Sequence, residues 1–163
     1  MQTQIVLQTL IAQQNKKPFE GVLVALDPGQ TTGYAIFHGD QLKEAGQLNT
    51  KTIEIGLQAL ENLLLKHRPD FVVYEAYRVY QHKTEDHANS DLHTSQFIGC
   101  IKVLCLQKGI KFHNQMASVA KQFCTDDKLR TWSLWVKGQK HARDAIRHGI
   151  YFLIFNWHKH VEE

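Results

Sequence analysis

The sequence predicts an α/β domain built on a mixed sheet, in which some neighbouring strands are parallel and others antiparallel. Two short apolar runs, at 22–26 and 34–37, and a third predicted strand over 42–48 are separated by Gly-containing turns, a pattern typical of an antiparallel meander. An amphipathic helical segment then leads to a further apolar run, and a helical crossover of this kind returns a strand parallel to the first.

The first half of the chain supplies the meander and the crossover. Residues 1–20 are Gln-rich and weakly amphipathic, so we expect a short helix or a loose arm there. Residues 50–67 predict a helix that Thr50 or Thr52 can cap, with Arg68-Pro69 ending it. The strands that we predict in this half are residues 21–27, 33–38, 42–48 and 71–74.

The second half is predicted to be mostly helical. Residues 76–90 are polar and His-rich, which favours a mobile loop. After it the sequence predicts, in order, a helix over 91–107, a strand over 110–113, short helical pieces over 117–123 and 125–135, and a final helix over 141–157.

Composition indicates one folded domain. The 163 residues are enough for one core, and we expect an arm over 1–20 and a domain over 21–158. No apolar run approaches the length of a membrane span, and the first residues lack the order of a signal peptide, so we expect a soluble protein. Cys100, Cys105 and Cys124 lack metal-ligand spacing, and reduced core thiols favour the cytoplasm or nucleoplasm.

Charge is distributed unevenly along the chain. The net charge of +3 divides into 8 basic and 11 acidic residues over 1–100, and 11 basic and 5 acidic residues over 101–163. The later part is therefore suited to phosphate contacts and the earlier part supplies carboxylates. An excess of Lys is also typical of an ordinary solvated face.

Two buried strands each end on an acid. Asp27 follows the first strand and Glu75 follows the strand at 71–74. If these strands are parallel neighbours, the two carboxylates lie side by side at one edge of the sheet. Asp27 alone, before Pro28-Gly29, is more typical of a surface turn, so its interpretation depends on the rest of the chain.

The final helix adds a third acid and an imidazole. His141 and Asp144 are three residues apart and so share one helix face, and Ala145 is small where the helix must approach the sheet. Clustered carboxylates are costly to keep ionised unless a cation lies among them. Oxygen ligands suit Mg²⁺ or Mn²⁺, and two such ions roughly 3.5–4 Å apart would activate water and stabilise the leaving oxygen of a phosphodiester.

These motifs resemble a known family. Asp27-Pro-Gly-x-Thr-Thr-Gly, the strand-terminal Glu75 and His141-x-x-Asp144-Ala together look like the RuvC family of Holliday junction resolvases, in the RNase H-like superfamily, and most like its phage-type members. The resemblance covers about residues 21–155. It implies an RNase H-like sheet of order 3-2-1-4-5 with helices on both faces. It also implies metal-dependent cleavage of branched DNA in recombination and repair, by a homodimer, in the cytoplasm of a bacterium or of a phage-infected host.

The resemblance also implies roles for individual residues. Asp27, Glu75 and Asp144 would be ligands of one or two Mg²⁺ or Mn²⁺ ions, and His141, where many members have Asp, would be a further ligand or a water-positioning base. Aromatic residues after Glu75 would stack on bases opened at the crossover, although Tyr77 can instead pack in the core. The residues expected to contact nucleic acid are Tyr77, Arg78, Tyr80, Lys83, Lys121, Lys137 and Lys140.

Three other functions fit parts of the pattern. Another RNase H-like nuclease would cut RNA or an RNA/DNA hybrid. A non-catalytic junction-binding protein would keep the fold without turnover, but all four candidate positions carry side chains able to bind a metal. A sugar-kinase or actin-like ATPase needs a second domain of this kind, and 163 residues do not hold one.

Overall fold

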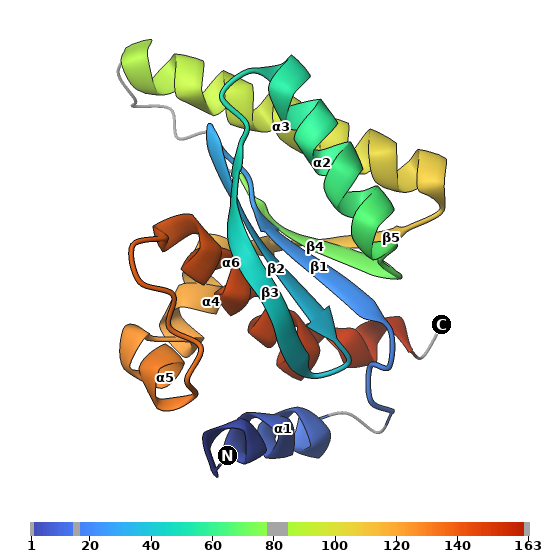
Figure 1. The fold of residues 1–163 in the computed structure, drawn as a ribbon, viewed down its shortest axis with the longest axis vertical. Helices are drawn as coiled ribbons and strands as arrows, with labels where there is room; N and C mark the ends of the chain where they lie inside the picture. The colour runs from blue at the N-terminus through green and yellow to red at the C-terminus, as the bar shows by residue number, and fades with distance from the viewer. Residues whose placement is uncertain (1, 15–16, 78–84, 162–163) are drawn as a thin grey trace.

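A five-stranded mixed sheet forms the centre of the computed structural model of this chain, with helices on both faces (Figure 1). The structure describes residues 2–14, 17–77 and 85–161. The strand order is β3-β2-β1-β4-β5, as predicted. The strands are β1 Val22–Asp27, β2 Thr31–His38, β3 Gln41–Asn49, β4 Phe71–Ala76 and β5 Lys111–Met116.

Strand β1 lies at the centre because its side chains are apolar on both faces. Leu23, Val24, Ala25 and Leu26 are all fully buried. Strand β1 pairs antiparallel with β2 and parallel with β4, and β5 extends the parallel half. The register pairs Leu26 with Tyr74, so the next residues of the two strands, Asp27 and Glu75, lie beside one another at one edge of the sheet.

The helices divide between the two faces of the sheet. Helices α2 and α3 cover one face, and α4, α5 and α6 cover the other (Figure 1). Thr52 caps α2 by accepting a hydrogen bond from the Ile55 N–H, and Arg68 ends it in a left-handed conformation. The helices are α1 Gln2–Gln14, α2 Ile53–His67, α3 Glu85–Lys108, α4 Ala117–Phe123, α5 Asp126–Thr131 and α6 Lys140–Tyr151.

Alternate residues of the central strands pack into two separate hydrophobic cores, one on each face of the sheet. Leu23, Ala25 and Val73 face α6 and the short helices, whereas Val24 and Val72 face α2 and α3. Residues 1–20, predicted to be a helix or an arm, contain α1, whose Leu7 and Ile11 are buried in the α6-side core. The chain's N-terminal segment therefore contributes to packing.

Several predicted boundaries were wrong. The strand predicted over 110–113 runs from Lys111 to Met116. The polar segment predicted to be a loop to residue 90 becomes helix α3 at Glu85. The helix predicted over 125–135 ends at Thr131, because Ser133 adopts a positive φ of 59°. The final helix is α-helical only to Tyr151, then continues as a π-helical turn, Phe152–Asn156, and a 3-10 turn, Trp157–His160.

Within the described residues, every helix is too short or too polar to cross a lipid bilayer.

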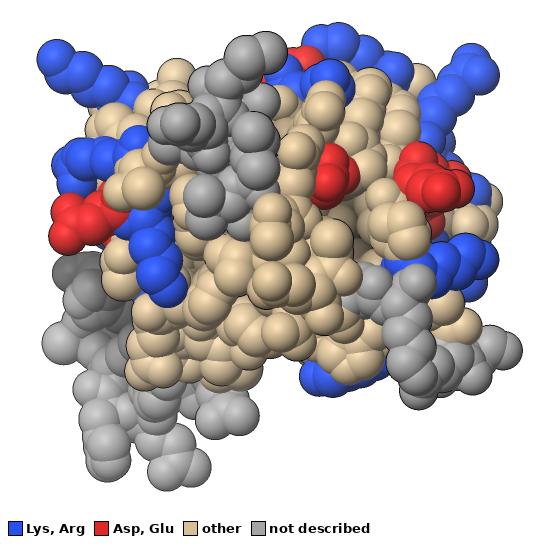
Figure 2. All heavy atoms as spheres, turned by 90° about the horizontal axis from the view of Figure 1, so that it is seen from below, with Lys and Arg blue, Asp and Glu red and all other residues tan. Residues whose placement is uncertain are grey.

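Figure 2 views the molecule from the end that carries α1. Uncharged residues cover most of this surface, and Lys and Arg side chains lie mainly around its margin.

Candidate active site

The two strand-end acids lie at the centre of the candidate site. Asp27 is 7% exposed and Glu75 is partly buried. Both come from backbone that the sheet holds rigid, since β1 and β4 are hydrogen-bonded neighbours. The prediction that parallel pairing brings these two carboxylates together is confirmed.

The hairpin after Asp27 is fixed by two buried hydroxyl groups. The Gly29 N–H donates to Thr32 Oγ1 at 3.3 Å, and Thr50 Oγ1 donates to the Gly29 carbonyl. The two hydroxyl oxygens lie 2.7 Å apart, and both residues are fully buried. Because β3 ends beside this hairpin and α2 begins soon after it, the position of the Asp27 backbone is tied to the whole meander.

The first turn of helix α6 places His141 next to Asp27. Its first turn packs on Gly33, where a side chain would collide with the His141 carbonyl group. Ala142 and Ala145, on the face of α6 that packs against the sheet, are fully buried; small side chains there let the helix lie close to the strands. The His141 N–H donates to Gln47 Oε1 at 3.1 Å, and its ring Nδ1 lies 2.8 Å from Asp27 Oδ2.

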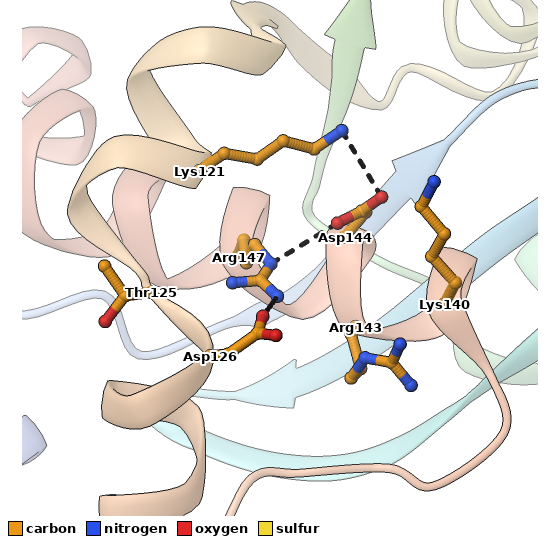
Figure 3. Close-up of a pocket in the computed structure, with 7 residues that line it drawn as sticks. All are labelled: Lys121, Thr125, Asp126, Lys140, Arg143, Asp144 and Arg147. Atoms are coloured by element: carbon orange, nitrogen blue, oxygen red, sulfur yellow. Dashed lines mark hydrogen bonds and ion pairs between the residues drawn. The ribbon is translucent and has the colours of Figure 1, made fainter.

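Asp144, one turn further along α6, is held by two cations. It is 6% exposed, and its Oδ2 lies 3.4 Å from Lys121 Nζ on α4. Its Oδ1 lies 3.3 Å from Nε of Arg147, whose guanidinium also donates to the Cys124 carbonyl and to Asp126. The ion pairs of Asp144 with Lys121 and Arg147, and that of Arg147 with Asp126, are drawn in Figure 3; they fix Asp144 between α4 and the body of α6.

The pKa values show that the four groups interact. Burial raises the pKa of Asp27, and the charges of Glu75 and Asp144 raise it further against the opposing hydrogen bond with His141. That hydrogen bond raises the pKa of His141 despite its partial burial. Burial opposes the ionisation of Glu75, but the hydrogen bond from His148 and the charge of Lys121 outweigh it, so the pKa of Glu75 is below its usual range.

The donor set suits a hard divalent cation. Within residues 2–14, 17–77 and 85–161, no three His, Cys, Asp or Glu side chains are gathered closely enough to share one ion. Asp27, Glu75 and Asp144 nevertheless supply carboxylate oxygens within electrostatic range of one another, and such oxygens are the ligands that Mg²⁺ and Mn²⁺ prefer. In the structure each carboxylate contacts a protein cation or ring N–H, with which a metal ion would compete.

A basic pocket of about 520 Å³ opens beside Asp144. Its lining includes four cationic side chains and two acidic ones, and Figure 3 shows the side chains of α4, α5 and α6 that surround it. The guanidinium of Arg143 donates to the Val136 carbonyl at 2.8 Å and lies 4.2 Å from the Trp135 ring centroid, so its position is fixed in advance. The residues lining the pocket are Lys121, Thr125, Asp126, Lys140, Arg143, Asp144 and Arg147.

The predicted nucleic-acid contacts fall in different places. Lys121 and Lys140 line the basic pocket, whereas Lys137 is exposed on the loop before α6. Tyr77 packs against the core under α2 and α3, the alternative to base stacking for this residue. The remaining three, Arg78, Tyr80 and Lys83, lie outside the residues that the structure describes.

Several residues at this site were not among those predicted to belong to it. Arg143 and Arg147 both line the basic pocket. His148 is fully buried with its Nε2 3.0 Å from Glu75 Oε2. Its spacing, four residues after Asp144 and seven after His141, was the available signal.

The fold is shared with solved structures of Holliday junction resolvases, although no protein-family model and no curated protein matches this sequence. RuvC of Thermus thermophilus in complex with a Holliday junction aligns with a TM-score of 0.62 at 14% identity, over 82% of this chain and 93% of that chain. The yeast mitochondrial Holliday junction resolvase Ydc2 aligns with a TM-score of 0.58 at 10% identity, over 97% of this chain and 86% of that chain.

A viral protein shares the same arrangement. The fowlpox virus Holliday junction resolvase aligns with a TM-score of 0.53 at 17% identity, over 81% of this chain and 97% of that chain. The predicted RuvC-like, RNase H-like fold is therefore confirmed.

Proposed function

We propose that this protein is a divalent-metal-dependent endodeoxyribonuclease that resolves four-way DNA junctions. The observation that carries the proposal is the convergence of Asp27, Glu75 and Asp144, from three distant segments, at one sheet edge beside a basic pocket. Support comes from the fold, which the chain shares with three Holliday junction resolvases. The reaction is phosphodiester hydrolysis, which needs no covalent protein nucleophile.

In this proposal the three carboxylates hold one or two Mg²⁺ or Mn²⁺ ions. The bound metal would supply Lewis-acid stabilisation of the phosphoryl oxygens and a more acidic water. Asp27 is the central ligand because it is the most enclosed by the other acids. His141, 43% exposed at its side chain, is open to solvent and serves as a further ligand or holds the attacking water.

The basic pocket is proposed to bind the DNA backbone next to the scissile phosphate. Lys121, Lys140 and Arg143 supply cationic donors, and phosphate contacts of this kind fix the register of a nuclease on its substrate. Lys137 extends the basic surface on the loop before α6. Arg78, Tyr80 and Lys83 are proposed to enter the branch point, where the aromatic ring of Tyr80 would stack on unpaired bases.

We also propose that the protein acts as a homodimer in the cytoplasm, since cutting a four-way junction symmetrically requires two active sites. Helices α2 and α3 carry six large apolar side chains that are exposed in the monomer, and burying apolar surface of this kind drives association. Sedimentation should show a dimer, and Leu106→Glu should weaken it. The six side chains are Ile55, Leu57, Leu65, Leu92, Val103 and Leu106.

The test of the function is cleavage of an immobile four-way junction, compared with linear duplex, RNA/DNA hybrid and structured RNA. With Mg²⁺ or Mn²⁺ the protein should cut the junction, and Asp27→Asn and Asp144→Asn should each lower the cleavage rate by at least about 100-fold while junction binding persists. Asp127→Asn is the matched control, because the Asp127 side chain is 99% exposed on α5.

Three results would contradict the proposal. Unchanged cleavage by the Asp27 and Asp144 variants would remove these residues from the active site. Preferential cleavage of hybrid or structured RNA would instead support a different RNase H-like nuclease. Metal-independent junction binding without any cleavage would point to a non-catalytic binding protein.

A further inference from the structure

His148 is a fully buried histidine that joins the candidate active site to a polar network behind it. It lies on α6, two turns after His141, and its Nε2 is 3.0 Å from Glu75 Oε2. Its other ring nitrogen, Nδ1, is 3.2 Å from the side-chain nitrogen of Gln115 on β5. A buried imidazole with partners on both nitrogens has one fixed orientation.

The directions of the hydrogen bonds follow from the groups that can only accept or only donate. The backbone carbonyl of His148 accepts from Gln115 Nε2 at 3.0 Å, so the amide nitrogen of Gln115 faces the imidazole. Gln115 Oε1 then accepts from Asn156 Nδ2 at 2.7 Å. At the far end of the network lies the ammonium group of Lys159, which can only donate. It donates to Asn156 Oδ1 at 2.9 Å, so the amide nitrogen of Asn156 is the atom that faces Gln115.

These directions decide where the imidazole carries its proton. Because Gln115 donates to Nδ1, that nitrogen acts as the acceptor, and Nε2 carries the hydrogen that is donated to Glu75. Gln115 and Asn156 are 4% and 7% exposed, so water does not compete for these bonds. The network thus makes His148 a constant donor toward one carboxylate oxygen.

The π-helical turn gives Asn156 its place in this network. In a regular α-helix of 3.6 residues per turn, residues eight apart are rotated by about 80° about the axis, which would turn Asn156 away from the face of His148. The wider turn over Phe152–Asn156 lowers the rotation per residue and returns Asn156 to that face. Single π turns inside helices are frequent at functional sites.

We propose that His148 is a positioning residue that holds Glu75 as a metal ligand, through a donor tautomer fixed by Gln115 and Asn156. This inference rests on the proposed function, because it assigns Glu75 to the metal site. By occupying Oε2, His148 leaves the remaining lone pairs of Glu75 for an ion and keeps the side chain from turning. The role is distinct from that of His141, which contacts Asp27 and is open to solvent.

The first test measures Mn²⁺ affinity of the full chain by calorimetry, without DNA. His148→Leu removes the donor and should weaken binding by about 10–100-fold, and His148→Gln, whose amide can donate from a similar position, should recover most of that loss. Ile150→Val is the control for a lost core contact, since Ile150 is fully buried on the same helix and packs in the core beside α6. It should bind Mn²⁺ as the wild type does.

The second test is nuclear magnetic resonance of the ring nitrogens in the wild-type protein. The nitrogen shifts of His148 should report a neutral ring with the proton on Nε2, and Asn156→Leu, which cuts the network beyond Gln115, should broaden or shift them. Because this readout uses the wild type and a distant variant, it remains decisive if His148→Leu does not fold. A ring protonated on Nδ1 would overturn the inference.

The two proposals fail in different ways. A wild-type protein that binds no Mn²⁺ and cuts no junction refutes the proposed function and this inference with it. A wild-type protein that binds Mn²⁺ and cuts junctions, while His148→Leu binds the ion equally well, refutes the role of His148 alone. In cleavage assays His148→Leu should lower kcat and leave the junction KM unchanged.

Discussion

The contact between Gly33 and the first turn of α6 makes the sharpest prediction about this site. A methyl group at position 33 would lie 2.8 Å from the Ala142 nitrogen and closer still to the carbonyl group of His141. These are backbone atoms, so no side-chain rotation relieves the collision. Gly33→Ala must therefore push the start of α6 away from β2, or bend both.

The size of the displacement follows from the contact distances. Non-bonded heavy atoms are at their optimum about 3.5–4.0 Å apart, so the first turn of α6 must move by roughly 1 Å or more. The imidazole of His141 moves with that turn, and its 2.8 Å hydrogen bond to Asp27 is lost or lengthened. A misplacement of about 1 Å costs on the order of 100-fold in rate, and overpacking lowers the free energy of unfolding by about 1–3 kcal/mol.

Junction cleavage and thermal unfolding, measured on the same preparations, test this reasoning. Gly29→Ala is the matched control, because a methyl group there would meet only the Thr31 carbonyl oxygen at 3.4 Å in the same hairpin. We expect Gly33→Ala to lose about 100-fold in kcat and Gly29→Ala to stay within a few-fold of the wild type. Equal activity of the two variants would show that the approach of α6 to β2 does not position the site.

Two further predictions concern stability and reactivity away from the site. The Tyr34 hydroxyl donates to Glu44 at 2.9 Å and is the main cause of the lowered pKa of Glu44, so Tyr34→Phe should lose about 1 kcal/mol of stability at pH 7. A carboxyl group whose pKa is lowered by folding stabilises the protein at pH values above its pKa in the unfolded chain, and this stabilisation is lost as the group becomes protonated. The difference in unfolding free energy between wild type and Tyr34→Phe, measured by denaturant titration, should therefore shrink as the pH falls below about 4. A difference that stays constant with pH would contradict the assignment. Burial raises the pKa of Cys105 to about 11 and of Cys124 to about 12, so at pH 8 a thiol reagent should modify Cys100 first in the native protein and all three thiols only after unfolding.

The centre of the sheet was predictable because its strands β1 and β4 are continuous apolar runs. A fully apolar run such as Val22–Leu26 is stable only where both faces are covered, so it belongs at the centre of the sheet. The start of α3 was not predictable in this way, because Glu85 to Ser90 carries no apolar stripe to set a helical period. The π turn at the end of α6 was not predictable either, because the residues that form it, Phe152–Asn156, show no pattern that distinguishes a π turn from a continuing α-helix.

The candidate site was predictable only in part, for a related reason. Asp27 and Glu75 follow buried strands, and strand topology alone places strand ends together. The side chains that hold the rest of the site come from other segments: Lys121 on α4 contacts Asp144, and Gln115 on β5 contacts His148. Asn156, on the π turn, in turn donates to Gln115. Their positions depend on how helices dock on the sheet, which sequence spacing within one segment does not encode.

Docking of α6 is therefore the step on which the site depends most. His141, Asp144 and His148 lie on this one helix and contact Asp27, Lys121 and Glu75 respectively. Two glycines seat the helix at opposite ends: Gly33 meets the backbone of its first turn, and Gly149, in its last turn, meets the ring of Phe37. A buried ring can shift slightly, whereas a backbone carbonyl on a helix cannot move alone. The end that carries His141 is thus the less tolerant of the two, and activity should be more sensitive to changes there than at Gly149.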